Sequence, residues 1–77
     1  MTPEIAAVYT QAPGAWPNGT RVQKRCSDES DAHANGALAT VCGSIGPAPW
    51  GEHGYWVHWD DMPGVPCFVV ERRLARV

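Results

Sequence analysis

"GYWVHWDDMPGVP", from Gly54 to Pro66, carries the clearest structural signal in the chain. Its first part, "YWVHWD", is typical of a β-strand because aromatic and β-branched side chains dominate it. The following "DMPGVP" is predicted to be a tight connection, since proline and glycine favour turns. The stretch therefore predicts the central hairpin of a small β-structure.

The predicted strand has two faces, because successive side chains of a strand point to opposite sides. One face carries Tyr55, Val57 and Trp59, and the other carries Trp56, His58 and Asp60. Since the second face holds the polar side chains, the first face is expected in the core, and Trp56 beside His58 is expected on the outer face.

Four further strands are predicted around this one, at residues 20–26, 37–45, 67–70 and 74–77, with a helical turn over Glu71–Arg73. On the second of them, Ala37, Ala39 and Val41 share one face, while Leu38, Thr40 and Cys42 share the other. Val22 is expected to point inward, with Cys26 as a second candidate for the same face. Eight glycines and seven prolines among 77 residues suit such short strands better than long helices.

Residues 1–17 are predicted to form an N-terminal arm, and residues 18–77 a single small domain. Thr2-Pro3-Glu4 is a good helix start, so a short helix over Ile5 to Tyr9 or an extended arm is expected. Trp16, in the irregular stretch that follows, is expected to pack against the domain.

The three cysteines, Cys26, Cys42 and Cys67, are an odd set without any Cys-x-x-Cys pair. No signal peptide is expected, and no apolar run reaches the roughly 20 residues that span a membrane. These features predict a cytoplasmic location with reduced thiols. A composition rich in Ala, Gly, Pro and Arg, with Lys24 as its single lysine, favours a GC-rich bacterial or phage source.

Four short motifs carry a resemblance to a known family: "GTRV" at Gly19–Val22, "GALATV" at Gly36–Val41, "YWVHWDD" at Tyr55–Asp61 and "FVVERRL" at Phe68–Leu74. They resemble the Src-homology-3-like small β-barrel in its KOW-like and Tudor-like versions, over about residues 18–77. The resemblance implies an all-β, five-stranded small barrel. Such barrels serve as peptide binders, nucleic-acid binders, subunit parts or spacers, so the fold alone assigns no function.

The function that we expect is a noncatalytic interaction module that binds a protein or peptide partner. Aromatic side chains would supply affinity and acidic ones would steer the partner. The predicted binding residues are Trp56, His58 and Trp50, rimmed by the first-loop acids Asp28, Glu29 and Asp31. In the structural alternative, Trp16 and Tyr9 cover Trp56 and complete a thin core, and the acidic loop is only solvated.

Two other functions stay open. A nucleic-acid-binding barrel would use Arg21, Lys24, Arg25, Arg72, Arg73 and Arg76, although a net charge of −2 disfavours it. A structural subunit would use the aromatic surface to associate with itself.

Neither a metal, nor a cofactor, nor an enzymatic activity is expected. Only His53 and His58 lie close in sequence among the cysteines and histidines, and zinc sites usually bring paired ligands at short spacing. Cys67, His58 and Asp60 are a nominal catalytic set, but no motif arranges them. His33 is expected to be exposed and without a role.

Overall fold

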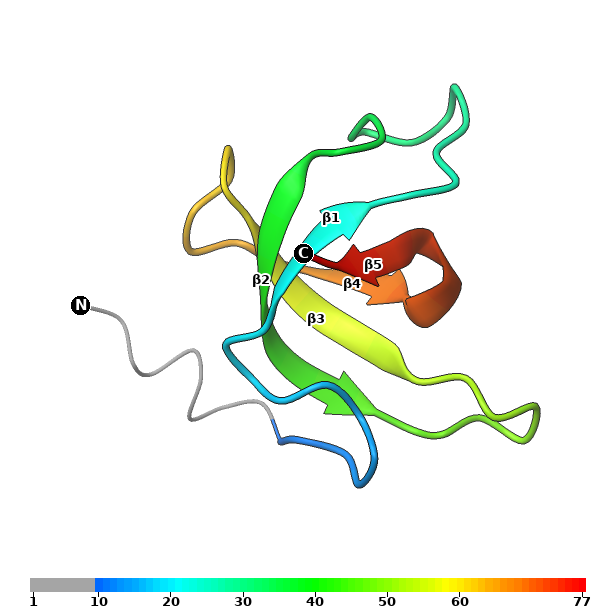
Figure 1. Cartoon of the computed structure of the whole chain (residues 1–77). Coiled ribbons are helices and arrows are strands. Elements are labelled where there is room, and N and C mark those ends of the chain that lie inside the picture. The colour runs from blue at the N-terminus through cyan, green and yellow to red at the C-terminus, as the bar shows by residue number, and fades with distance from the viewer. Residues whose placement is uncertain (1–9) are drawn as a thin grey trace.

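A computed structural model describes residues 10–77, and its regular structure is one five-stranded sheet (Figure 1). The strands are β1 (Arg21–Lys24), β2 (Leu38–Ile45), β3 (Gly54–Trp59), β4 (Pro66–Val70) and β5 (Leu74–Arg76), with the 3₁₀ turn η1 (Glu71–Arg73) before β5. This confirms the predicted order of five strands and the helical turn, with strand ends shifted by up to two residues.

All neighbouring strands are antiparallel, and the sheet order is β4-β3-β2-β1-β5. The expected barrel is not closed, because β4 and β5 are the two edges of the sheet and do not pair with each other. Turn chemistry and local alternation predict strands, but closure depends on whether the two outermost strands reach each other. Here a cleft, described below, lies along the inner side of β4.

The core lies on one face of β3, as the alternation predicts. Tyr55, Val57 and Trp59 are all buried, whereas Trp56 and His58 are half-buried. The same cluster takes in Val22 from β1, Ala39 and Val41 from β2 and Leu74 from β5. Val22 therefore points inward as expected, while Cys26 is exposed.

The middle of β2 contains an irregularity that its sequence did not predict. The register with β3 shifts between Val41 and Gly43, so that Cys42 is an extra residue on β2. Such a bulge bends a strand and changes the face of the next residues. As a result Cys42 and Ser44 are both buried, next to the buried Val41.

The predicted N-terminal helix lies outside the described residues, and residues 10–20 form turns without a helix. Trp16 packs as expected: its indole stacks on the ring of Tyr55 with centroids 4.8 Å apart. Its backbone N–H also donates a 3.0 Å hydrogen bond to the Tyr55 hydroxyl. Ala12 is held in the same way, since its N–H donates to the Ser44 Oγ at 2.8 Å. Residues 12–16 are thus fixed on the sheet rather than separate from it.

Candidate functional site

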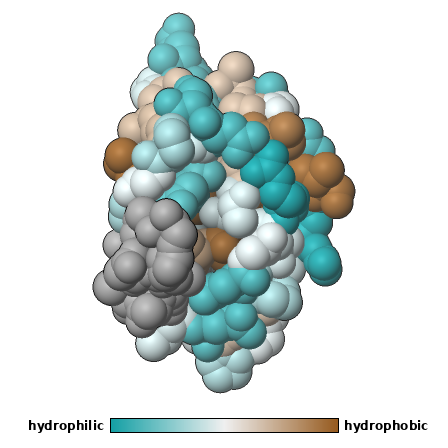
Figure 2. All heavy atoms as spheres, turned by 90° about the vertical axis from the view of Figure 1, so that its left-hand side faces the viewer, coloured by the Kyte–Doolittle hydropathy of each residue, from teal (hydrophilic) through white to brown (hydrophobic). Residues whose placement is uncertain are grey.

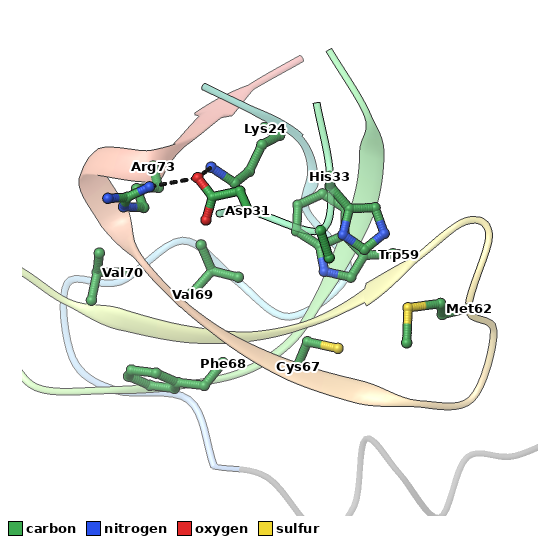
Figure 3. Close-up of a pocket in the computed structure, with 11 residues that line it drawn as sticks. Lys24, Asp31, His33, Trp59, Met62, Cys67, Phe68, Val69, Val70 and Arg73 are labelled. Carbon is green, nitrogen blue, oxygen red and sulfur yellow. Dashed lines mark hydrogen bonds and ion pairs between the residues drawn. The ribbon is translucent and has the colours of Figure 1, made fainter. Parts of the chain in front are cut away.

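A cleft of about 380 Å³ runs along the inner side of β4, where the sheet stays open (Figure 3). One wall is β4 itself, over residues 67–70, and the other is Lys24, Arg73 and residues 31–33 of the β1–β2 loop. Trp59 and Met62 close one end. We call it the seam cleft, and its volume falls at the lower end of the range for small-ligand sites.

Asp31 organises the charged wall of the seam cleft. Its Oδ2 accepts hydrogen bonds from Arg73 Nη1 at 2.7 Å, Lys24 Nζ at 3.2 Å and the Asp28 N–H at 3.0 Å. The Asp28 N–H first, and then the two cations, hold the pKa of the Asp31 carboxyl below its ordinary value, against the opposing effect of partial burial. Lys24 is buried, so Asp31 supplies the counter-charge that a buried ammonium group requires.

His33 lies against the core, which corrects the expectation that it is exposed without a role. Its side chain is only 10% exposed, and its ring stacks on Trp59 with centroids 4.2 Å apart. Its Nε2 is hydrogen-bonded to Asp61 Oδ1 at 2.9 Å. The β1–β2 loop is therefore attached to the turn before β4, and nothing in the spacing of the loop residues predicted this contact.

Trp50 is the most exposed aromatic side chain of the described residues, at 74%, and it is held in place. Its Nε1 donates a 3.1 Å hydrogen bond to Glu52 Oε1. Glu52 in turn accepts from the backbone N–H and the guanidinium of Arg72, at 3.0 and 2.6 Å. The Trp50 hydrogen bond is the main reason that the pKa of the Glu52 carboxyl lies below its ordinary value, and Arg72 adds to it. An exposed indole that is fixed in this way loses little entropy when it binds a partner.

Phe68 connects Trp50 to Trp56. Its ring lies over Gly54 of the neighbouring strand and meets Trp56 edge to face, with centroids 5.1 Å apart. Phe68 and Trp50 both line a second hollow of about 250 Å³, together with Ile45 and Val70. We call these five residues, Ile45, Trp50, Trp56, Phe68 and Val70, the aromatic patch.

Sequence reasoning missed Phe68, which is 48% exposed. The run "CFVV" has no polar residue to mark an outer face, so it gave no sign that Phe68 points outward. The usable signal was Gly54, a glycine at the start of a strand that can accommodate a ring from the neighbouring strand.

The structure separates the predicted site into two parts. Trp50 lies on the loop after β2, and Asp28, Glu29 and Asp31 lie on the loop before it, at opposite ends of the strand (Figure 1). The acids therefore do not rim Trp50, and Asp28 and Asp31 are paired with Arg73. His58 is half-buried on the outer face between Thr40 and Pro66, and its buried Nε2 has no hydrogen-bond partner.

Most of the predicted basic set is neutralised within the chain. Arg21 makes two 2.8 Å hydrogen bonds to Asp60, which lower the pKa of that carboxyl, and Arg72 pairs with Glu52. Lys24 and Arg73 share Asp31. Within residues 10–77, only Arg25 and Arg76 of this set make no ion pair. Figure 2 shows one largely hydrophilic face, on which hydrophobic atoms gather in small groups.

The nominal catalytic and metal sets are not assembled in the described part of the chain. No three His, Cys, Asp or Glu side chains there are placed to hold a metal ion. Asp60 is engaged by Arg21, and the Cys67 thiol faces the Val65 carbonyl at 3.7 Å. Burial raises the pKa of the Cys42 thiol, which lowers its reactivity at neutral pH.

In comparisons with known proteins, no family model, no curated protein and no solved structure matches the chain. Within residues 10–77, no helix is long and apolar enough to cross a bilayer. The aromatic patch and the seam cleft are therefore the features of this chain from which a function can be inferred.

Proposed function

We propose that this chain is a noncatalytic interaction module that binds a protein or peptide partner through its aromatic patch. The observation that carries the proposal is Trp50, a largely exposed indole held by Glu52, which itself is held by η1. A core-forming tryptophan would be buried, and an exposed one without a role would not need this fixation. Aromatic side chains in such positions supply most of the affinity of protein interfaces.

The partner binds around Phe68, and the acids of the β1–β2 loop do not steer it. Phe68 contacts Trp56 and shares a hollow with Trp50, so apolar side chains are present from the loop after β2 to the centre of β3. Asp28 and Asp31 act in folding, through Arg73 and Lys24, instead of steering the partner. A cytoplasmic location and a relationship to Src-homology-3-like barrels remain part of this proposal. The five antiparallel strands and the 3₁₀ turn before the last one support that relationship.

Selection from a displayed library of random dodecapeptides tests the proposal. We expect the wild-type chain to enrich a set of peptides, and the Trp50→Ala variant to bind them about tenfold or more weakly, as loss of a central aromatic contact does. Leu38→Ala is the matched control, since Leu38 is an exposed apolar residue outside the aromatic patch. Equal affinities for wild type and Trp50→Ala, or no enrichment, would contradict the proposal.

A further inference from the structure

The phase of the β3–β4 ladder determines which backbone groups of β4 point outward. The Glu71 N–H donates to the His53 carbonyl at 3.1 Å, and hydrogen-bonded pairs alternate along an antiparallel ladder. Cys67 and Val69 therefore bond to β3, whereas Phe68 and Val70 direct their N–H and C=O groups away from it. Pro66 agrees with this phase, because it occupies an outward position where no N–H is needed for the ladder.

Among the strands of residues 10–77, none pairs with this outward edge of β4. β4 ends the sheet, and the backbone hydrogen bonds of turns and loops in residues 10–77 include none from the Phe68 or Val70 N–H. Exposed edges are usually protected by charged side chains. β5 follows that rule, with Arg73 before it and Arg76 on it, but residues 62–70 contain no charged residue at all.

Two hollows flank the same edge, one on each face of the sheet. All four residues line the seam cleft, but only Cys67 and Val69 also pack against the core, whereas Phe68 and Val70 also line the hollow beside Trp50. Figure 3 shows Val69 on one side of the β4 ribbon and Phe68 on the other. Because side chains of a strand alternate between the two faces, a strand added to β4 would place successive side chains in the two hollows.

The charges around the two hollows indicate what the added strand carries. Asp31 is paired with Lys24 and Arg73, and Glu52 with Arg72. A charged side chain entering either hollow would find its counter-charge already engaged and would lose its hydration, which is costly. The arrangement therefore suits a segment with uncharged, apolar side chains.

The small volume of the seam cleft and the short edge of β4 make a folded copy of the chain a poorer occupant than an extended segment. The seam cleft lies between β4 and an outer wall formed by Arg73 and residues 31–33. Its volume of about 380 Å³ holds a few side chains. Stable dimers bury about 1,200 Å² or more of total surface, whereas β4 offers the outward backbone groups of only two residues for pairing.

From these observations we infer that the partner binds as an added β-strand: an extended, uncharged segment of another protein pairs with Phe68 and Val70 and fills the seam cleft and the hollow beside Trp50 with alternate side chains. This inference rests on the proposed function and specifies how the partner is bound. Affinity comes from main-chain hydrogen bonds, and selectivity comes from the two hollows.

Val70→Pro isolates the backbone contribution. Val70 has φ −77° and ψ 154°, values that proline adopts without strain. The substitution removes the outward N–H and leaves the ladder to β3 intact. Val70→Thr is the matched comparison, because it changes the same side chain but keeps the N–H, so that the difference between the two variants reports the lost backbone donor.

The experiment measures the affinity of the selected dodecapeptides for wild type, Val70→Thr, Val70→Pro and Trp50→Ala. We expect enrichment of uncharged peptides with apolar residues at alternate positions. Binding to Val70→Pro should be about tenfold weaker than binding to Val70→Thr, because one hydrogen bond is lost. In wild type, bound peptide should slow hydrogen exchange of the Phe68 and Val70 amides. That second measurement decides the question if Val70→Pro does not fold.

Several results would overturn the inference. Unchanged binding by Val70→Pro, enrichment of charged or proline-rich peptides, or unprotected Phe68 and Val70 amides would exclude strand addition. If strand addition were excluded but Trp50→Ala still weakened binding, the proposed function would stand without strand addition. Unchanged binding by Trp50→Ala would contradict the proposed function as well. A wild-type chain that sediments as a dimer, and a monomeric Val70→Pro variant, would identify a second copy as the occupant instead.

Discussion

The imidazole of His33 stacks on the indole of Trp59, with centroids 4.2 Å apart and 15° between the ring planes. This contact joins the β1–β2 loop to the end of β3, and the bond from His33 Nε2 to Asp61 extends it to the following turn. The two contacts fix the loop that forms the outer wall of the seam cleft.

Replacing His33 by alanine should lower the free energy of unfolding by about 1–2 kcal/mol, because the stacking and the hydrogen bond are both lost. Urea denaturation measures the change. His33→Phe is the control: it keeps a stacked ring without the Asp61 bond and should recover most of the stability. Equal stability of His33→Ala and wild type would mean that the loop is held elsewhere.

Asp31→Asn should destabilise the protein at neutral pH, because the buried Lys24 then loses its carboxylate. The pH dependence of the free energy of unfolding also reports on the Asp31 carboxyl. The folded-state pKa of Asp31 is lowered, so its stabilisation is present above the unfolded pKa of about 3.9 and is lost as the pH falls through the lower folded value.

The measurement is the urea midpoint of both proteins from neutral pH down through the acid range. Wild type should lose stability as the pH drops below about 4, and Asp31→Asn should lose less over the same interval. Glu29→Gln, on the same loop, controls for a general charge effect, since Glu29 makes no ion pair within residues 10–77. Parallel acid profiles for wild type and Asp31→Asn would show that Asp31 does not contribute to this loss.

The sequence predicted β3 well because its signal is local. Tyr55, Val57 and Trp59 alternate with Trp56 and His58, and alternation alone separates a buried face from an outer one. Turn residues were equally informative about where the strands end. The Trp16 packing followed from the cost of leaving an indole in water.

The ion pairs could not be predicted in the same way, because their partners lie far apart in the sequence. Asp31 meets Arg73, and Arg21 meets Asp60, only after the strands have paired. A charge cluster read along the chain therefore suggested a basic surface and an acidic rim, while folding brings the two sets together. Failure of the barrel to close has a similar origin, since it depends on how far β4 lies from β5.

The three cysteines should react with a thiol reagent in a fixed order. Cys26 is exposed, Cys67 is half-buried and Cys42 is buried with a raised thiol pKa. Under native conditions Cys26 should be modified first, Cys67 more slowly, and Cys42 only when the sheet unfolds. Mass spectrometry of digested samples over time identifies the modified residue. Early modification of Cys42 would show that β2 opens at its bulge.

Gly54→Ala should displace Phe68 from the sheet. A Cβ at position 54 would overlap Phe68 Cζ and lie 2.6 Å from Cε1, so the ring must leave its place over Gly54. We expect a loss of about 1–2 kcal/mol, the usual cost of forcing an extra methyl group into a packed contact. Near-ultraviolet circular dichroism should also change, because Phe68 packs edge to face on Trp56.

A double-mutant cycle with Phe68→Ala makes this prediction specific. Without the ring, the extra methyl group has nothing to displace, so Gly54→Ala should cost little in the Phe68→Ala background. The same cost in both backgrounds would show that the backbone at Gly54, and not the ring above it, requires glycine. The outcome also bears on binding, because Gly54 holds Phe68 in the position that connects Trp56 with Trp50.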